Sequence, residues 1–356
     1  MLSVRLKPLR SIAFVVGSPF ADSINAAGIA GVDAGLGADT CAATLAVSGC
    51  GGGDEKPPGL FAYVFAPATG APPDPGLVIR ADEAAVDEAV AIVAAGGAAR
   101  VTSSTPLTTG SGCDAGGACT SIGPLSHITA WPGGGADSVS VGEGLPPHVS
   151  VDLNGGFGND TLTGSSLGEV FYGWYGADTV QAKGGDDALI SEGRGEGAGP
   201  DLLSAGKGDD QLVTDHPCAG HSMVGGPGYD IAGFARSWIP VRARIGGAVT
   251  HVEGKCSGGR PGAIRPDHEV LEGSQHDRGD ILIGSRRGET IWGRGGGDTI
   301  IGRGGADTLL GFSGPDFIDA RDGQRDRLLR CGKGDDYPAR RDRIDPPAIR
   351  CESRQP

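Results

Sequence analysis

Aromatic residues are scarce in this chain: they make up 5% of its 356 residues, and only 4 of them are Trp. Large aromatic side chains supply much of the volume of a thick globular core. We therefore expect many thin layers in place of one large apolar centre. Long hydrophobic runs are also missing, because no stretch reaches the roughly eighteen consecutive apolar residues that a membrane-spanning helix needs. The sequence thus predicts a chain with no transmembrane segment.

Positive charge is in short supply as well. The chain has 30 Lys and Arg against 44 Asp and Glu, which gives a net charge of −14 and a pI of about 4.9. An acidic surface repels nucleic acid and anionic membranes, so both are excluded as partners. The same excess of carboxylates suits a chain that binds cations.

Histidine is rare, with 7 residues, and the spacing of the 8 cysteines fits no zinc finger. An even number of cysteines favours disulfides and an oxidising compartment; buried free thiols are the alternative. We expect sequential pairs, although other connectivities stay open. The expected pairs are Cys113–Cys119, Cys218–Cys256 and Cys331–Cys351.

Glycine, by contrast, is abundant, with 66 residues, and it recurs in a fixed pattern. Between residues 276 and 320 an acid stands at every ninth position, and a large apolar residue follows two positions after each acid. The acids are Asp280, Glu289, Asp298, Asp307 and Asp316. A disordered Gly/Asp linker has no reason to keep that apolar residue, so a linker is the interpretation only for the chain without metal.

The repeat is the nonapeptide G-G-x-G-x-D-x-U-x, where U is large and apolar, which is typical of a calcium-binding parallel β-helix. Glycines allow a tight turn, whose carbonyl and carboxylate oxygens suit Ca²⁺. Two nonapeptides form one coil, so acids on one edge are eighteen residues apart: Asp280, Asp298 and Asp316 on one edge, Glu289 and Asp307 on the other. Coils stack about 4.8 Å apart, which leaves room for an ion between stacked turns.

A first block of the same repeat covers residues 151–215. Gly155–Thr163 matches the nonapeptide at every fixed position. Glu169, Asp178 and Asp187 follow at intervals of nine, and the pattern resumes with Asp201 and Asp210 after a break. The second block covers residues 276–320.

The segments around the two blocks have other patterns. Residues 59–150 read as a small β domain, in which Asp82–Ala95 is a strand or, alternatively, a helix. Residues 216–275 read as a β insert whose hairpin has Pro240 near its turn. Residues 321–356 are rich in arginine and predict a disulfide-closed cap, with an interaction tail as the alternative.

Residues 1–58 read as an export segment and linker. A basic start, Met1–Arg10, precedes the short apolar run Ser11–Gly17, as in a signal peptide. The alternative is a lipobox at Val47–Cys50, with the chain lipid-anchored at Cys50. Both interpretations predict an extracellular protein.

The repeats at roughly 151–212 and 276–320 resemble the RTX, or haemolysin-type calcium-binding, family, and the order of the segments resembles secreted bacterial RTX-like proteins. The resemblance implies an all-β protein with a right-handed parallel β-roll that holds several Ca²⁺ ions. The carboxylates and glycine carbonyls expected to bind metal are Asp160, Asp178, Asp187, Asp210, Asp280, Asp298, Asp307, Asp316, Gly156, Gly158, Gly296 and Gly305. Glu169 and Glu289 depart from the family's aspartate.

No catalytic constellation is apparent in the sequence. Gly164–Gly168 matches the G-x-S-x-G elbow of hydrolases but lies inside the nonapeptide register, and Ser222 lacks the required glycine two residues later. We therefore expect a non-enzymatic, secreted or surface-attached calcium-binding protein. The alternatives are a secreted hydrolase that uses the repeats as a scaffold, and an adhesin or matrix protein that binds cell-surface or matrix components.

Overall fold

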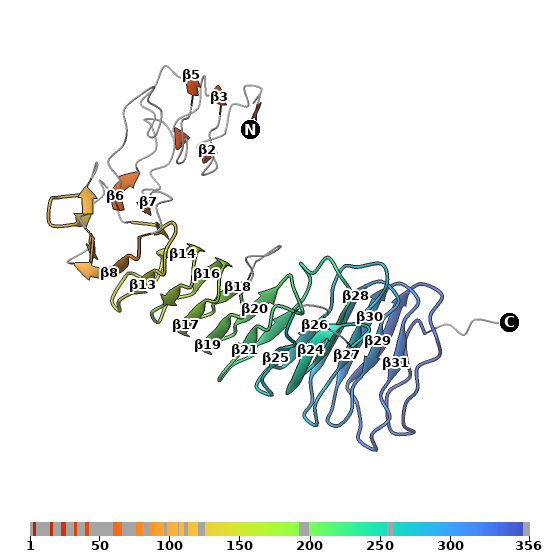
Figure 1. Ribbon diagram of the computed structural model, residues 1–356. Helices are drawn as coiled ribbons and strands as arrows, with labels where there is room; N and C mark the ends of the chain where they lie inside the picture. The colour runs from red at the N-terminus through yellow and green to blue at the C-terminus, as the bar shows by residue number, and fades with distance from the viewer. Residues whose placement is uncertain are drawn as a thin grey trace. The chain divides into compact units, whose positions relative to one another are not determined.

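The computed structural model describes residues 76–80, 86–95, 98–105, 107–109, 113–119, 125–191, 199–254, 256 and 259–351, and the strands N-terminal to them. In this part of the chain the regular elements are β-strands, and there is no helix (Figure 1). Accordingly, none of these residues forms a helix long and apolar enough to cross a membrane. The predicted all-β class is confirmed.

The chain divides into two compact units, residues 1–135 with 142–150, and residues 136–141 with 151–356. In the first unit, β8 (Ala89–Ala95) pairs antiparallel with β9 (Ala98–Ser103), and Ala95 stands opposite Ala98. The strand interpretation of residues 89–95 is therefore correct, and the helical alternative is wrong there. The other strands are β1 (Ser3–Val4), β2 (Val15–Val16), β3 (Ser23–Asn25), β4 (Val32–Asp33), β5 (Thr40–Ala42), β6 (Leu60–Phe65), β7 (Gly76–Arg80), β10 (Leu107–Thr109), β11 (Ala118–Cys119) and β12 (His127–Trp131).

The second unit is a solenoid whose strands alternate between two sheets. We use the names sheet 1 and sheet 2 for the parts of these two sheets that this unit contributes. Sheet 1 consists, in order, of β14 (Ser150–Phe157), β16 (Glu169–Tyr175), β18 (Ala188–Ser191), β20 (Gln211–Thr214), β22 (Ile231–Gly233), β26 (Val270–Glu272), β28 (Thr290–Gly295), β30 (Thr308–Ser313) and β32 (Leu328–Lys333). Sheet 2 consists, in order, of β13 (Ser138–Val141), β15 (Thr161–Thr163), β17 (Thr179–Gly184), β19 (Leu202–Lys207), β21 (Ser222–Val224), β25 (Gly262–Ile264), β24 (Gly247–His251), β23 (Val241–Arg244), β27 (Ile281–Ile283), β29 (Thr299–Ile301) and β31 (Phe317–Asp319).

Apolar side chains of successive coils stack between the two sheets. In sheet 1, Leu153 pairs with Phe171 and Phe171 with Leu189; in sheet 2, Leu162 pairs with Val180. All five side chains are fully buried. The apolar residues predicted to point inward in the second block, two positions after each acid, are fully buried too: Leu282, Ile291, Ile300, Leu309 and Ile318. Each buried side chain of this size contributes about 1.5–3 kcal/mol, so a thin core of stacked layers replaces a thick one.

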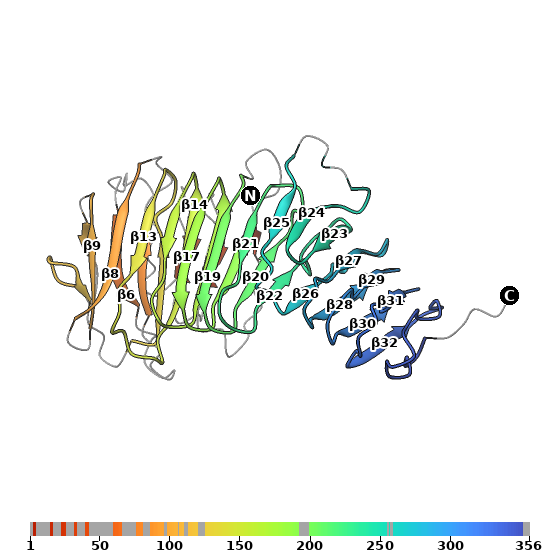
Figure 2. The ribbon, with the colours of Figure 1, turned by 90° about the horizontal axis from the view of Figure 1, so that it is seen from below.

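The solenoid is interrupted on one side only. Sheet 1 continues from β20 through β22 and β26 to β28, with parallel pairing throughout. Between β25 and β27, sheet 2 gains the antiparallel strands β24 and β23. Two extra strands widen sheet 2 by about 4.8 Å each. Figure 2 shows the result: the strands from β27 onward run in a different direction from those before β25.

This arrangement corrects the expected insert at residues 216–275. Four strands of that segment, β21, β22, β25 and β26, belong to the two stacks, and only β23 and β24 interrupt them. The hairpin turn lies at residues 245–246 between these two strands, whereas Pro240 immediately precedes β23. The hairpin itself was predicted, but its turn was misplaced.

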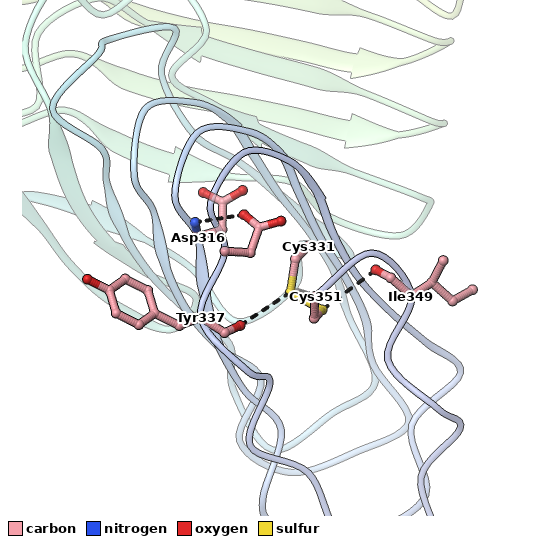
Figure 3. The surroundings of a disulfide bond; sticks show 6 residues. Asp316, Cys331, Tyr337, Ile349 and Cys351 are labelled. Atoms are coloured by element: carbon pink, nitrogen blue, oxygen red, sulfur yellow. Dashed lines mark hydrogen bonds between the residues drawn. A yellow bond between two sulfur atoms is a disulfide. The ribbon is translucent and has the colours of Figure 1, made fainter. Parts of the chain in front are cut away.

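Two predicted disulfides are present, Cys218–Cys256 and Cys331–Cys351. Cys113 is disulfide-bonded as well, and its predicted pairing with Cys119 stays a prediction. Figure 3 shows Cys331–Cys351 close to the turn that carries Asp316. The predicted cap at 321–356 contains one further strand of sheet 1, β32. The predicted lipobox at 47–50 and most of the predicted signal peptide lie outside the described residues.

Candidate metal centre

Two rows of acidic residues run along the solenoid, one at each edge. At most positions of each row, a carboxylate oxygen accepts a hydrogen bond of 2.7–3.1 Å from the backbone N–H of the corresponding acid one coil earlier. The first edge, in the turns that lead into sheet 2, carries Asp137, Asp160, Asp178 and Asp201, then Asp280, Asp298, Asp316 and Asp336. The second edge, in the turns that lead into sheet 1, carries Glu169, Asp187, Asp210, Asp230, Glu269, Glu289, Asp307, Asp326 and Asp345.

The rows agree with the predicted assignment of acids to edges. The N–H of Asp280 donates to Asp298, and that of Asp298 donates to Asp316. On the other edge the N–H of Glu289 donates to Asp307. The structure therefore places the predicted acids of each edge next to one another in successive coils. Their binding of metal stays a prediction.

The second oxygen of most of these carboxylates has no protein partner. One oxygen, Oδ1, takes the backbone N–H, and the other, Oδ2, is buried without a hydrogen bond. These aspartates are at most 3% exposed. They are Asp160, Asp178, Asp187, Asp210, Asp230, Asp298, Asp307, Asp316 and Asp326. An unsatisfied buried carboxylate oxygen is costly, and a bound cation would remove that cost.

Glycines leave the space into which these oxygens point. A Cβ added to Gly155 would lie 2.5 Å from Oδ2 of Asp160, and one added to Gly173 would lie 2.7 Å from Oδ2 of Asp178. Any larger residue would therefore fill the space beside the carboxylate. Neighbouring turns pack closely against each other's backbone. A Cβ on Gly176, for example, would collide with the carbonyl oxygen of Gly158.

The four glycines predicted as carbonyl ligands stand in these turns. Gly156, Gly158, Gly296 and Gly305 have φ values of 101°, 128°, 95° and 113°, in the left-handed region that favours glycine. The carbonyl oxygens of Gly158 and Gly296 face the turn of the next coil, at Gly176 and Gly314.

Burial makes these carboxylates hard to ionise in the absence of a cation. Desolvation, opposed by the backbone hydrogen bond and reinforced by neighbouring acids, raises the pKa of Asp178 and of Asp298 from 3.8 to about 8. The same causes raise the pKa of Asp187 to about 8 and of Asp307 to about 7. Desolvation also raises the pKa of Asp316 to about 7. A cation at each turn would stabilise the ionised form and oppose this cost.

The donor set fits calcium. The unpartnered atoms are carboxylate oxygens, and the surrounding turns offer backbone carbonyls; hard cations prefer such ligands, whereas softer metals prefer imidazole and thiolate. At the turns with an unpartnered Oδ2, the Asp carboxylates and glycine carbonyls would hold the ion, which would supply positive charge between stacked coils.

Several acids of the rows also accept hydrogen bonds from serine residues. Oε1 of Glu169 accepts from the N–H and the hydroxyl of Ser165. In Glu289 both oxygens are bonded by Ser285: Oε2 accepts its N–H at 3.2 Å and Oε1 accepts its hydroxyl. Asp280, a predicted ligand, has both oxygens occupied, by the N–H groups of Val241 and Ser274 and the hydroxyl of Ser274. The turns of Glu289 and Asp280, in which both carboxylate oxygens are bonded, are therefore less suited to a cation than their neighbours.

Asp201 is the clearest exception. Its Oδ2 accepts a 2.5 Å hydrogen bond from the hydroxyl of Ser191 and lies 3.2 Å from Nδ1 of His221. His221 takes the place of the next acid on the first edge, because the N–H of Asp201 donates to its Nδ1 at 3.1 Å. All three side chains are at most 5% exposed. A Ser–Asp–His cluster thus supplies protein partners to the carboxylate of this turn.

The sequence interpretation missed two aspartates that share the unpartnered oxygen, Asp230 and Asp326. The signal for Asp230 was present, since Gly225–Asp230 fits G-G-x-G-x-D, but the insert assignment overrode it. Asp326 stands nineteen residues after Asp307, one more than the regular repeat, and Leu328 follows two positions later. Leu328, the apolar residue two positions after Asp326, was the sequence signal that could have identified Asp326 as a member of the row.

The serine motifs have no hydrolase context. The segment Gly164–Gly168 forms the turn between β15 and β16, and the hydroxyl of Ser165 is bonded to Glu169. Ser222 begins β21, a strand of the parallel stack. Neither serine stands on a strand–turn–helix elbow.

Comparison with known proteins identifies the repeats. The model of the RTX calcium-binding nonapeptide repeat matches four copies, at residues 152–166, 197–215 and 279–324. No curated protein matches the chain. The matched segments contain Asp160, Asp210, Asp298, Asp307 and Asp316, and Asp178 and Asp187 continue the same rows between them.

Proposed function

Because the chain carries RTX calcium-binding nonapeptide repeats in a β-solenoid, we propose that it is a secreted or surface-attached protein whose solenoid forms when Ca²⁺ binds along its two edges. The observation that supports this most is the row of buried aspartates whose Oδ2 atoms have no partner in the protein. Calcium concentrations outside cells are about millimolar, which suits extracellular calcium modules.

In this proposal binding free energy becomes folding free energy. The carboxylates repel one another in the unbound chain, and their burial is unfavourable until a cation neutralises them. An ion would join the turns of two coils, so each bound ion favours the stacking of its neighbours. Family members are typically secreted, and the disulfides Cys218–Cys256 and Cys331–Cys351 suit an oxidising compartment.

The proposal assigns no catalytic role. The N-terminal unit, or the exposed faces of the solenoid, would then meet the partner, with cell-surface or matrix components as the class that suits a surface-attached protein. The repeats supply a rigid, calcium-dependent support for that contact.

Asp298→Asn tests the site directly. The variant keeps an oxygen to accept the Asp280 N–H but loses the charge that would bind the ion. We expect one bound Ca²⁺ fewer per chain in equilibrium dialysis. Asp277→Asn, at an exposed position of a neighbouring turn, is the matched control and should bind as the native protein does. An unchanged ion count in Asp298→Asn would contradict the proposal.

A further inference from the structure

One turn of the second edge, at residues 321–326, differs from the others. Carboxylate oxygens of Asp307, Asp322 and Asp326, one from each side chain, all lie within 4.8 Å of one another. Asp307 and Asp326 belong to the row of acids, but Asp322 occupies a turn position that is glycine in Gly155–Asp160 and arginine in Gly302–Asp307. This turn therefore offers a third carboxylate.

Each of the three carboxylates is held in the same way. Oδ1 of Asp307 accepts the N–H of Glu289 at 2.8 Å, and Oδ1 of Asp326 accepts the N–H of Asp307 at 2.9 Å. Oδ1 of Asp322 accepts the N–H of Gln324 at 2.6 Å. In all three the Oδ2 atom is buried and has no hydrogen-bond partner. Asp307 and Asp326 are 0% and 3% exposed, so two of the unpartnered groups are almost completely buried.

The arginine-rich tail holds this turn in place. Oδ2 of Asp342 accepts the N–H of Asp322 at 2.8 Å and the N–H of Gly323 at 2.5 Å. Oδ1 of Asp345 accepts the N–H of Asp326 at 3.0 Å. The Cys331–Cys351 disulfide closes the segment that carries Asp342 and Asp345. The third carboxylate is thus fixed by backbone contacts before any ion binds.

We propose that Asp307, Asp322 and Asp326 form a three-carboxylate calcium site that binds Ca²⁺ more tightly than the two-carboxylate turns along the rest of the solenoid. The inference rests on the proposed function and adds a rank order to its sites. Calcium–oxygen distances of about 2.3–2.6 Å put ligand oxygens at most about 5 Å apart across the ion, which matches the observed spacing. Calcium affinity rises with the number of charged ligands and with the rigidity of the site.

Isothermal titration of the full-length, EDTA-treated protein with CaCl₂ tests the rank order. In the native protein we expect one tight step ahead of the weaker ones. Asp322→Asn keeps an oxygen for the Gln324 N–H and should weaken that tight step at least tenfold, while the weaker steps stay. Asp322→Glu keeps the charge and should retain more of the tight step than Asp322→Asn. Asp277→Asn is the control for loss of an exposed charge.

The outcomes separate this inference from the proposed function. An unchanged tight step in Asp322→Asn, together with loss of an ion in Asp298→Asn, would overturn the three-carboxylate site alone. A native protein that takes up no Ca²⁺ would overturn both. Circular dichroism of each variant at saturating Ca²⁺ checks that the solenoid is formed, and Asp322→Glu supplies the comparison if Asp322→Asn does not fold.

Discussion

Asp178 and Asp201 occupy successive turns of the first edge, yet only Asp178 has a carboxylate oxygen without a hydrogen-bond partner. Both accept a backbone N–H through Oδ1, from Asp160 and Asp178 respectively. Oδ2 of Asp178 has no partner, whereas Oδ2 of Asp201 is bonded to Ser191 and lies beside His221. We therefore expect that the repeat position alone does not make a ligand and that an unpartnered second oxygen is also needed.

This difference predicts unequal effects of the same substitution. Asp178→Asn should lower the calcium stoichiometry by one ion, because it removes a charged, unpartnered oxygen. Asp201→Asn should leave the ion count unchanged, because its oxygens already have protein partners. Equilibrium dialysis of the two variants beside the native chain measures this. Loss of an ion in Asp201→Asn, or none in Asp178→Asn, would show that the unpartnered oxygen does not mark the ligands.

The two edges differ in continuity because only one of the two sheets contains inserted strands. Sheet 1 runs without inserted strands, so the second edge continues from Glu169 to Asp345. Strands β24 and β23 interrupt sheet 2, and the first edge stops at His221 and resumes at Asp280. At the resumption the N–H of Val241, which starts β23, takes the place of an acid and donates to Asp280.

Both edges predict an unusual pH dependence of stability. Buried acids such as Asp178 and Asp298 have a folded-state pKa of about 8 against 3.8 for the ordinary side chain, mainly because of desolvation. A raised pKa contributes stability that is fully present below about pH 4 and is lost as the pH rises through about 8; each pKa unit corresponds to at most about 1.4 kcal/mol.

The calcium-free protein should therefore have more β structure, and lose it at higher urea concentration, at pH 5 than at pH 8. With saturating Ca²⁺ the order should reverse, since the ion competes with protons for the same oxygens. Urea titrations followed by circular dichroism at the two pH values, with EDTA or with Ca²⁺, give the comparison. A calcium-free protein that is more stable at pH 8 would contradict the burial of these carboxylates.

The sequence was sufficient to predict the coils but not their interruption. Glycine turns, an acid every nine residues and the apolar residue after it specify register, so Asp298 and Asp316 could be placed on one edge in advance. The place of the β23–β24 hairpin depends on the pairing of β24 with β25 and of β23 with β27, which no local pattern reports. Short strands such as β22 have no long pattern either. The role of His221 depends on Ser191, thirty residues earlier, and no local motif reports that contact.

The solenoid as a whole behaves as a one-dimensional stack, in which each coil mainly contacts its two neighbours. Its stability is then close to a sum of coil and interface terms. In the proposed function, every interface that carries an unpartnered carboxylate would depend on bound Ca²⁺. The Cys218–Cys256 disulfide lies beside the hairpin, and Cys331–Cys351 lies at the last coil. Covalent links therefore stand where the regular repeat is interrupted and where it ends.

The most direct test of the account is a far-UV circular dichroism titration of the EDTA-treated protein with Ca²⁺, with Mg²⁺ as the control ion. We expect a cooperative gain of β signal with Ca²⁺ at up to millimolar concentrations and little change with Mg²⁺, which is smaller and prefers octahedral sites. A full β signal already present in EDTA at neutral pH, and unchanged by Ca²⁺, would contradict the central claim that the ion drives formation of the solenoid.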